Sequence, residues 1–353
     1  MGLVSLVSAC RSPEGADLSF LADRPALPCS VLLTGGAFLR DGGVEAGDGS
    51  KGRTFSTASD EAFALAAVGD LLVRARVFVR TETDARSSAE RQALAGASAA
   101  QVGDVPAFDG VLRQARADGH DYLLVLERLD DGPVQALGVN GQWPITLSTW
   151  LLVGLGALIP DHGYESRASL RASLRDVHDG HAVQELVIGA STVDLSLLER
   201  SGVWGWIQSI LVPPFWVGDD DERVVQSVRV VVEQRLMIGL AQRLKSVDVA
   251  DRLTRRQPAA IEVQRGRDGS LGLDVTARES VSFLRLRVDD EVVAGDAFDG
   301  FHRAFLGSRL PAGDALRYHA SLPRLPAGDR LQVLVQTITG RVGSVSFDLR
   351  QLP

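Results

Sequence analysis

The segment Arg167-Ala-Ser-Leu-Arg-Ala-Ser-Leu-Arg175 decides the fold of the larger part of this chain. Arginine and serine alternate with alanine and leucine, and a period of two is typical of a β-strand with one wet face and one buried face. Asp179-Gly180 then supplies turn chemistry, and an apolar run follows over residues 182–188. We therefore predict a β-hairpin that turns at Asp179-Gly180.

Patterns of helix and strand alternate around this hairpin. We predict strands at residues 30–39, 75–81, 122–127 and 134–139, and helices at about 62–73 and 108–117. A longer helix is predicted over residues 222–245, because apolar residues recur there at helical spacing. The acids of Asp219–Glu222 lie where the dipole at a helix start favours negative charge. Residues 28–247 thus read as one domain with a mixed α/β sheet.

The pattern changes at about residue 258. Short apolar strands recur from there at the spacing of a β-sandwich, with Pro-Ala-Gly turn chemistry at 311–313 and 326–328. We therefore expect an α+β protein, in which the mixed α/β sheet domain (28–247) is followed by an immunoglobulin-like β-sandwich domain (258–353).

Charge and cysteine content exclude several classes of function. The chain of 353 residues has a formal net charge of −8 and no run rich in lysine or arginine. Nucleic acid is therefore not an expected partner, since phosphate binding needs a basic surface. The only cysteines, Cys10 and Cys29, cannot form a structural zinc site, and we predict neither a metal nor a cofactor. We expect Cys29 to be a small buried residue at a strand entrance, or the disulfide partner of Cys10.

Near the N-terminus, a short apolar run ends in Val7-Ser8-Ala9-Cys10 and is followed by the polar residues 11–15. This arrangement resembles the lipobox of bacterial lipoproteins, although residues 1–9 carry no positive charge and are short for a signal peptide. The resemblance implies that the Cys10 thiol is diacylated and that residues 1–27 are a signal remnant and tether. It also implies an outer-membrane lipoprotein that faces the periplasm. The alternative is an N-terminal segment whose cysteine has no such role.

The order of the predicted elements adds a second resemblance. A strand at 122–127 after a helix, the hairpin at 167–188 and the closing helix at 222–245 are similar to the small α/β domains of envelope lipoproteins. Examples are the curli secretion-channel lipoprotein and the lipoprotein activators of peptidoglycan synthases. The likeness implies a non-catalytic role in the cell envelope, exerted through assembly or partner binding.

All the tryptophans lie in two apolar stretches, residues 143–160 and 203–217. They are Trp143, Trp150, Trp204, Trp206 and Trp216. Three interpretations stay open: ordinary core, contact with a bilayer or partner, or walls around an apolar small molecule or lipid. The stretch 143–160 has prolines near both ends and only about the minimum length of a membrane span, so we do not predict one.

No set of residues is spaced for catalysis, and we predict no catalytic residue. His178 and His181 flank the hairpin turn, where solvent-facing histidines are expected rather than metal ligands. Asp161-His162 has no evident nucleophile as a partner, and a Gly-x-Ser-x-Gly elbow does not occur. The leading hypothesis is a non-catalytic envelope lipoprotein. A carrier of an apolar molecule between 143–160 and 203–217 is the alternative, and a hydrolase without a recognisable motif is the third.

Overall fold

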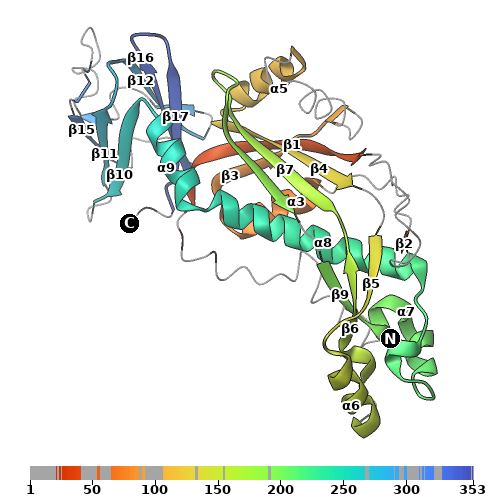
Figure 1. Cartoon of the computed structure of the whole chain (residues 1–353). Coiled ribbons are helices and arrows are strands. Elements are labelled where there is room, and N and C mark those ends of the chain that lie inside the picture. Colours follow the sequence, from red (N-terminus) through yellow and green to blue (C-terminus); the bar gives the residue numbers. More distant parts are fainter. Residues whose placement is uncertain are drawn as a thin grey trace.

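The computed structural model combines helices with several β-sheets, which confirms the predicted α+β class (Figure 1). It describes residues 21, 24, 26–40, 54–55, 65–86, 90–91, 106–131, 134–153, 156–189, 192–266, 270–289, 291–293, 298–299, 310, 312–313, 315–321, 328–350 and 352. The lipobox-like residues 7–10 lie outside these ranges, as do Pro311, Pro326 and Ala327 of the two Pro-Ala-Gly turns.

A mixed sheet forms the centre of the larger domain, with the strand order β3-β1-β4-β7-β8. Its strands are β1 (Leu27–Arg40), β3 (Phe78–Thr83), β4 (Tyr122–Asp131), β7 (Ala168–Asp176) and β8 (Ala182–Gly189). β1 pairs in parallel with β3 and β4, while β7 pairs in antiparallel fashion with β4 and β8. Two helices lie along the parallel connections, α3 (Leu65–Arg74) and α5 (Pro106–Ala117).

The predicted hairpin is β7–β8. Ala168, Leu170, Ala172 and Leu174 are all buried, as the alternation indicates. The chain turns through Gly180, whose φ of 74° lies in the left-handed region that favours glycine.

The predicted closing helix is α8 (Asp221–Leu244), which packs across one face of the mixed sheet (Figure 1). Its 24 residues give it a length of about 36 Å. Asp220 caps its N-terminus by accepting a hydrogen bond from the Arg223 backbone N–H at 3.3 Å. The core below it joins side chains of α8 to side chains of the sheet: Val228, Val232, Leu236 and Leu240 with Val31, Leu33, Leu124 and Leu170.

A second, smaller sheet was not predicted. It has the order β2-β5-β6-β9 and consists of β2 (Thr54–Phe55), β5 (Val134–Val139), β6 (Pro160–Glu165) and β9 (Thr192–Ser196). The strand β6 contains Pro-Asp-His-Gly, a composition typical of a loop, and tertiary pairing with its neighbours overrides that local preference. This sheet matters because helices α6 and α7 are attached to it.

After α9 (Val247–Arg256) the chain forms two antiparallel four-stranded sheets, β10-β11-β15-β14 and β13-β12-β16-β17. Their strands are β10 (Ala259–Arg265), β11 (Ser270–Ala277), β12 (Val281–Val288), β13 (Glu291–Val292), β14 (Phe298–Asp299), β15 (Ala315–Ser321), β16 (Arg330–Thr337) and β17 (Val342–Asp348). Side chains of both sheets form one core, as in a β-sandwich. Val249 and Leu253 of α9 belong instead to the core of the first domain, which therefore extends past residue 247.

The two domains meet at Asp121, at the entrance of β4. Its buried carboxylate accepts hydrogen bonds from the Ser30 N–H at 2.7 Å, from Gln332 Nε2 at 2.9 Å and from Ser346 Oγ at 2.7 Å. The Ser344 hydroxyl also donates to it. Donors from both domains thus surround one buried charge, and the sandwich is held at the end of the molecule opposite α6 and α7 (Figure 1).

Candidate functional site: an exposed apolar tip

Two excursions from the smaller sheet build the end of the molecule remote from the β-sandwich (Figure 1). The first contains α6 (Trp143–Val153) and the short helix η2 (Gly156–Leu158), and it returns to the sheet through β6. The second leaves β9 through α7 (Leu197–Gln208) and the short helix η3 (Pro214–Trp216) before α8 begins. We call residues 143–158 and 197–217 the apolar tip.

Most large apolar side chains of the apolar tip face outward. Trp204 is 77% exposed, Trp216 is 72% exposed and Leu211 is 86% exposed. The other exposed ones are Trp143, Ile145, Leu151, Leu158, Val203, Trp206, Ile207, Ile210 and Val212. Among the side chains of the tip that the structure describes, the buried apolar cluster consists of Ala157, Leu197 and Val217. The ordinary-core interpretation is therefore wrong for four of the tryptophans; large exposed apolar patches are typical of interaction surfaces in general.

A kink in α7 places its second half. Gly202 has φ 66° and ψ −158° inside the helix, so residues 203–208 form a separate turn that presents Trp204 and Trp206. A Cβ atom at residue 202 would lie 2.6 Å from the Arg223 guanidinium carbon. Glycine is therefore required here for its backbone conformation, and the guanidinium of the exposed Arg223 would have to move to admit a Cβ atom.

A buried arginine fixes the segment that carries Trp216. Arg200 is fully buried, and its guanidinium donates to the carbonyls of Pro214 and Val217 and to Asp219 Oδ1. The contact to Asp219 is 2.7 Å, and Arg200 Nε lies 3.6 Å from the buried carboxylate of Asp161. Trp216 thus lies in a segment whose backbone carbonyls are bonded to a buried, ion-paired arginine.

Trp150 has a different role from the other tryptophans. It is half-buried, and its indole N–H donates to the carbonyl of Ser209, which ties α6 to the end of α7. Trp143 and Phe215 pack edge to face with ring centroids 6.0 Å apart, and Phe215 packs in the same way on Trp216 at 5.5 Å. These contacts join α6, α7 and η3 into one unit.

Most of the apolar tip contains no charged residue. Residues 143–160 and 201–218 contain no Asp, Glu, Lys, Arg or His. Charged residues lie at the base: the buried Asp161 and Arg200, the half-buried Glu199 and Asp219, and the exposed acids Asp220, Asp221 and Glu222. The two apolar stretches are visible in the sequence, but the ion pairs at their base are not. Arg200 is distant in sequence from both of its carboxylate partners, Asp161 and Asp219.

The histidines do not all behave as expected. His181 is exposed, but His178 is half-buried, because the β-sandwich packs against the hairpin and brings Ser344 Oγ to 3.4 Å from His178 Nε2. Burial lowers the pKa of His178. Ser344 is itself buried, and its hydroxyl donates a hydrogen bond to Asp121 and not to His178. The three side chains therefore differ from a catalytic triad, in which the serine hydroxyl donates to the histidine. His162 contacts Asp161 at 3.0 Å in the base of the tip.

Two further sequence-based expectations concern Cys29 and membrane spans. Cys29 is a free thiol that is 2% exposed at the start of β1, as expected for a small buried residue. Within the described part of the chain, no helix has the length and apolarity that crossing a membrane requires. α6 has only 11 residues.

Comparisons with known proteins found distant structural similarities only. No protein-family model and no curated protein matches the chain. A solved structure described as a neuraminyllactose-binding hemagglutinin homolog from Helicobacter pylori aligns with 65% of this chain and 91% of its own, at 10% identity and a TM-score of 0.29. A DUF330 protein from Xanthomonas campestris aligns with 63% of this chain and 91% of its own, at 11% identity and a TM-score of 0.20.

Proposed function

We propose that this protein is a non-catalytic lipoprotein of the bacterial cell envelope that docks on a bilayer through its apolar tip. The tether is the acylated Cys10, and the location is the periplasmic face of the outer membrane. The observation that carries the proposal is the solvent exposure of Trp204, Leu211 and Trp216 on one end of the molecule.

The chemistry of the apolar tip favours a bilayer over a protein partner. Protein interfaces have polar rims and about one hydrogen bond per 100–200 Å² of buried area. Residues 203–217 provide few polar side chains for such a rim. Gln208 is exposed and can form hydrogen bonds, but Ser209 is buried. Tryptophan prefers the membrane–water interface, where its apolar ring and its N–H are both satisfied.

The depth of contact follows from the same geometry. α6 is too short to cross the hydrocarbon core, and the tip ends at the charged residues 219–222. Charges are costly inside hydrocarbon, so Asp220 and Asp221 limit insertion to the interfacial region. The protein would lie on one leaflet in a defined orientation, with the β-sandwich farthest from it.

The tether and the tip are tested separately. Metabolic labelling with a radioactive fatty acid should label the parent protein and not Cys10→Ala, and equal label in both, or none in the parent, would remove the tether. For the tip, the full chain carrying Cys10→Ser is floated with vesicles of phosphatidylethanolamine and phosphatidylcholine. Leu211→Asp should reduce flotation at least fivefold.

Val247→Asp is the matched control for the flotation experiment. Val247 is also an exposed apolar residue, at 68%, but it lies at the start of α9 and outside the apolar tip. Its substitution should leave flotation unchanged. Equal flotation of the Leu211→Asp and Val247→Asp variants would contradict docking through the tip.

A further inference from the structure

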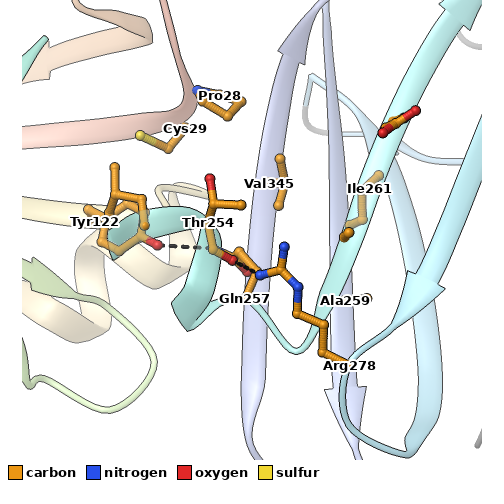
Figure 2. A pocket seen from close by; sticks show the side chains of 12 residues that line it. Pro28, Cys29, Tyr122, Thr254, Gln257, Ala259, Ile261, Arg278 and Val345 are labelled. Carbon is orange, nitrogen blue, oxygen red and sulfur yellow. Dashed lines mark hydrogen bonds between the residues drawn. The ribbon is translucent and has the colours of Figure 1, made fainter. Parts of the chain in front are cut away.

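A cavity of about 230 Å³ lies between the two domains and has no wall in common with the apolar tip (Figure 2). Strands β1, β4, β10 and β17, the end of α9 and the connection after it contribute its walls. Among the lining residues are Cys29, Tyr122, Leu253, Gln257, Ala260 and Val345. The carrier hypothesis placed a ligand between the tryptophan-bearing stretches, whereas this cavity lies at the domain boundary.

Small side chains leave this space open. Cys29, Ala259 and Ala260 surround it where a closely packed interior would have larger residues. Figure 2 shows Cys29 on one side of the space, with Ala259 and Ile261 across from it. An engineered cavity of about 150 Å³ lined by aliphatic side chains binds benzene. The interdomain cavity is therefore large enough for a substituted benzene ring.

Tyr122 brings a buried hydroxyl group to the wall of the cavity. The side chain is 1% exposed, and its hydroxyl oxygen accepts a hydrogen bond from Gln257 Nε2 at 2.9 Å (Figure 2). The described residues provide no acceptor for the hydroxyl proton. Burial raises the pKa of Tyr122, so the phenol keeps this proton. A buried donor without an acceptor costs stability, and a ligand that supplies the acceptor removes that cost.

The mouth of the cavity is electrically balanced. Arg278 and Glu262 are both exposed there and carry opposite charges, and the Arg278 guanidinium already donates to the carbonyl of Thr254. Neither an anion nor a cation is favoured by such a pair. We propose that the interdomain cavity binds a small, neutral aromatic molecule with one acceptor atom, which accepts a hydrogen bond from the Tyr122 hydroxyl.

Two probes of the same size test this site. Acetophenone has a carbonyl acceptor, and ethylbenzene has a methylene group in its place. The Kd of each is measured by ligand-observed NMR on the full chain with Cys10→Ser. We expect acetophenone to bind about tenfold more tightly than ethylbenzene, the difference that one hydrogen bond to a buried donor makes. In Tyr122→Phe the two probes should bind alike.

The Ala260→Leu variant tests whether the probes bind in this cavity or on the apolar tip. Ala260 is half-buried, so the larger side chain fills the space while the domain stays folded, as circular dichroism checks. Its Kd for acetophenone should rise at least tenfold. Equal affinity of the parent for both probes, binding of neither, or unchanged affinity in Ala260→Leu would overturn the proposal.

Discussion

The carboxylate of Asp121 in β4 and the hydroxyl of Ser346 in β17 lie 2.7 Å apart and join the two domains of this protein. Both side chains are buried. Asp121 also bonds the Ser30 N–H and Gln332, so one carboxylate satisfies donors from both sides of the boundary. The two domains are therefore expected to unfold together.

Substituting Asp121 tests this coupling. Asp121→Ala leaves several buried donors without an acceptor, and we expect it to lower the free energy of unfolding by about 3 kcal/mol. The measurement is urea unfolding followed by circular dichroism. Asp118→Ala is the control, because Asp118 lies in the turn before β4 and is exposed. If both variants unfold at the same urea concentration, the carboxylate does not hold the domains together.

Arg200 should determine the conformation of the segment that presents Trp216. Arg200→Met removes the cation that faces the buried Asp161 and the half-buried Asp219, so we expect a loss of about 3–5 kcal/mol. The near-ultraviolet circular dichroism of the tryptophans should weaken with it. Arg200→Met/Asp161→Asn should recover part of the stability, since one of the unpaired charges is then removed. Identical spectra for the parent and Arg200→Met would show that the segment is fixed by other contacts.

Gly202 is expected to be intolerant of a side chain. Gly202→Ala combines a left-handed backbone with a Cβ placed against the Arg223 guanidinium, and we expect a cost of about 2 kcal/mol. Gly202→Ala/Arg223→Ala removes the clash but keeps the backbone cost, so it should be less destabilised. Thermal unfolding measures both. A Gly202→Ala protein with the Tm of the parent would contradict the kink.

We expect the protonation of His120 to contribute to the pH dependence of stability. This histidine is 1% exposed and lies near the domain boundary. Burial lowers the pKa of His120 below 6.5, although Glu82, 3.1 Å away, acts in the opposite direction. The unfolded chain therefore takes up a proton first as the pH falls. We expect stability to be constant above about pH 6.5 and to decrease below it.

The test compares urea midpoints between neutral and mildly acidic pH. His120→Gln should show a shallower decrease than the parent, because it has no ring to protonate. His181→Gln, in an exposed turn, is the control and should follow the parent. Parallel curves for the parent and His120→Gln would eliminate His120 as the source.

The local pattern of apolar and polar residues was sufficient to predict several elements of the fold. The alternation at 167–175 predicted β7, the Asp179-Gly180 turn predicted the hairpin, and the spacing of valines and leucines after Glu222 predicted α8. These features depend on side chains close together in the sequence. The strand β6 could not be predicted in the same way, since its pairing partners and not its composition make it a strand.

The candidate site was only partly predictable for a related reason. Tryptophans at 204 and 216 were visible as a group, but periodicity does not tell whether an apolar segment is covered by another. Their exposure follows from the kink at Gly202 and from the bonds of Arg200 to residues 214–219, which are tertiary contacts. The domain boundary at Asp121 depends on serines more than 200 residues away.

Tryptophan fluorescence tests docking through the apolar tip most directly, because every tryptophan of the chain lies at 143–216. The full chain with Cys10→Ser is mixed with neutral vesicles whose lipids carry bromine either near the headgroup or near the end of the acyl chain. We expect strong quenching by the shallow bromines, weak quenching by the deep ones, and little of either in Leu211→Asp. Emission that neither lipid quenches would contradict contact between the apolar tip and a bilayer.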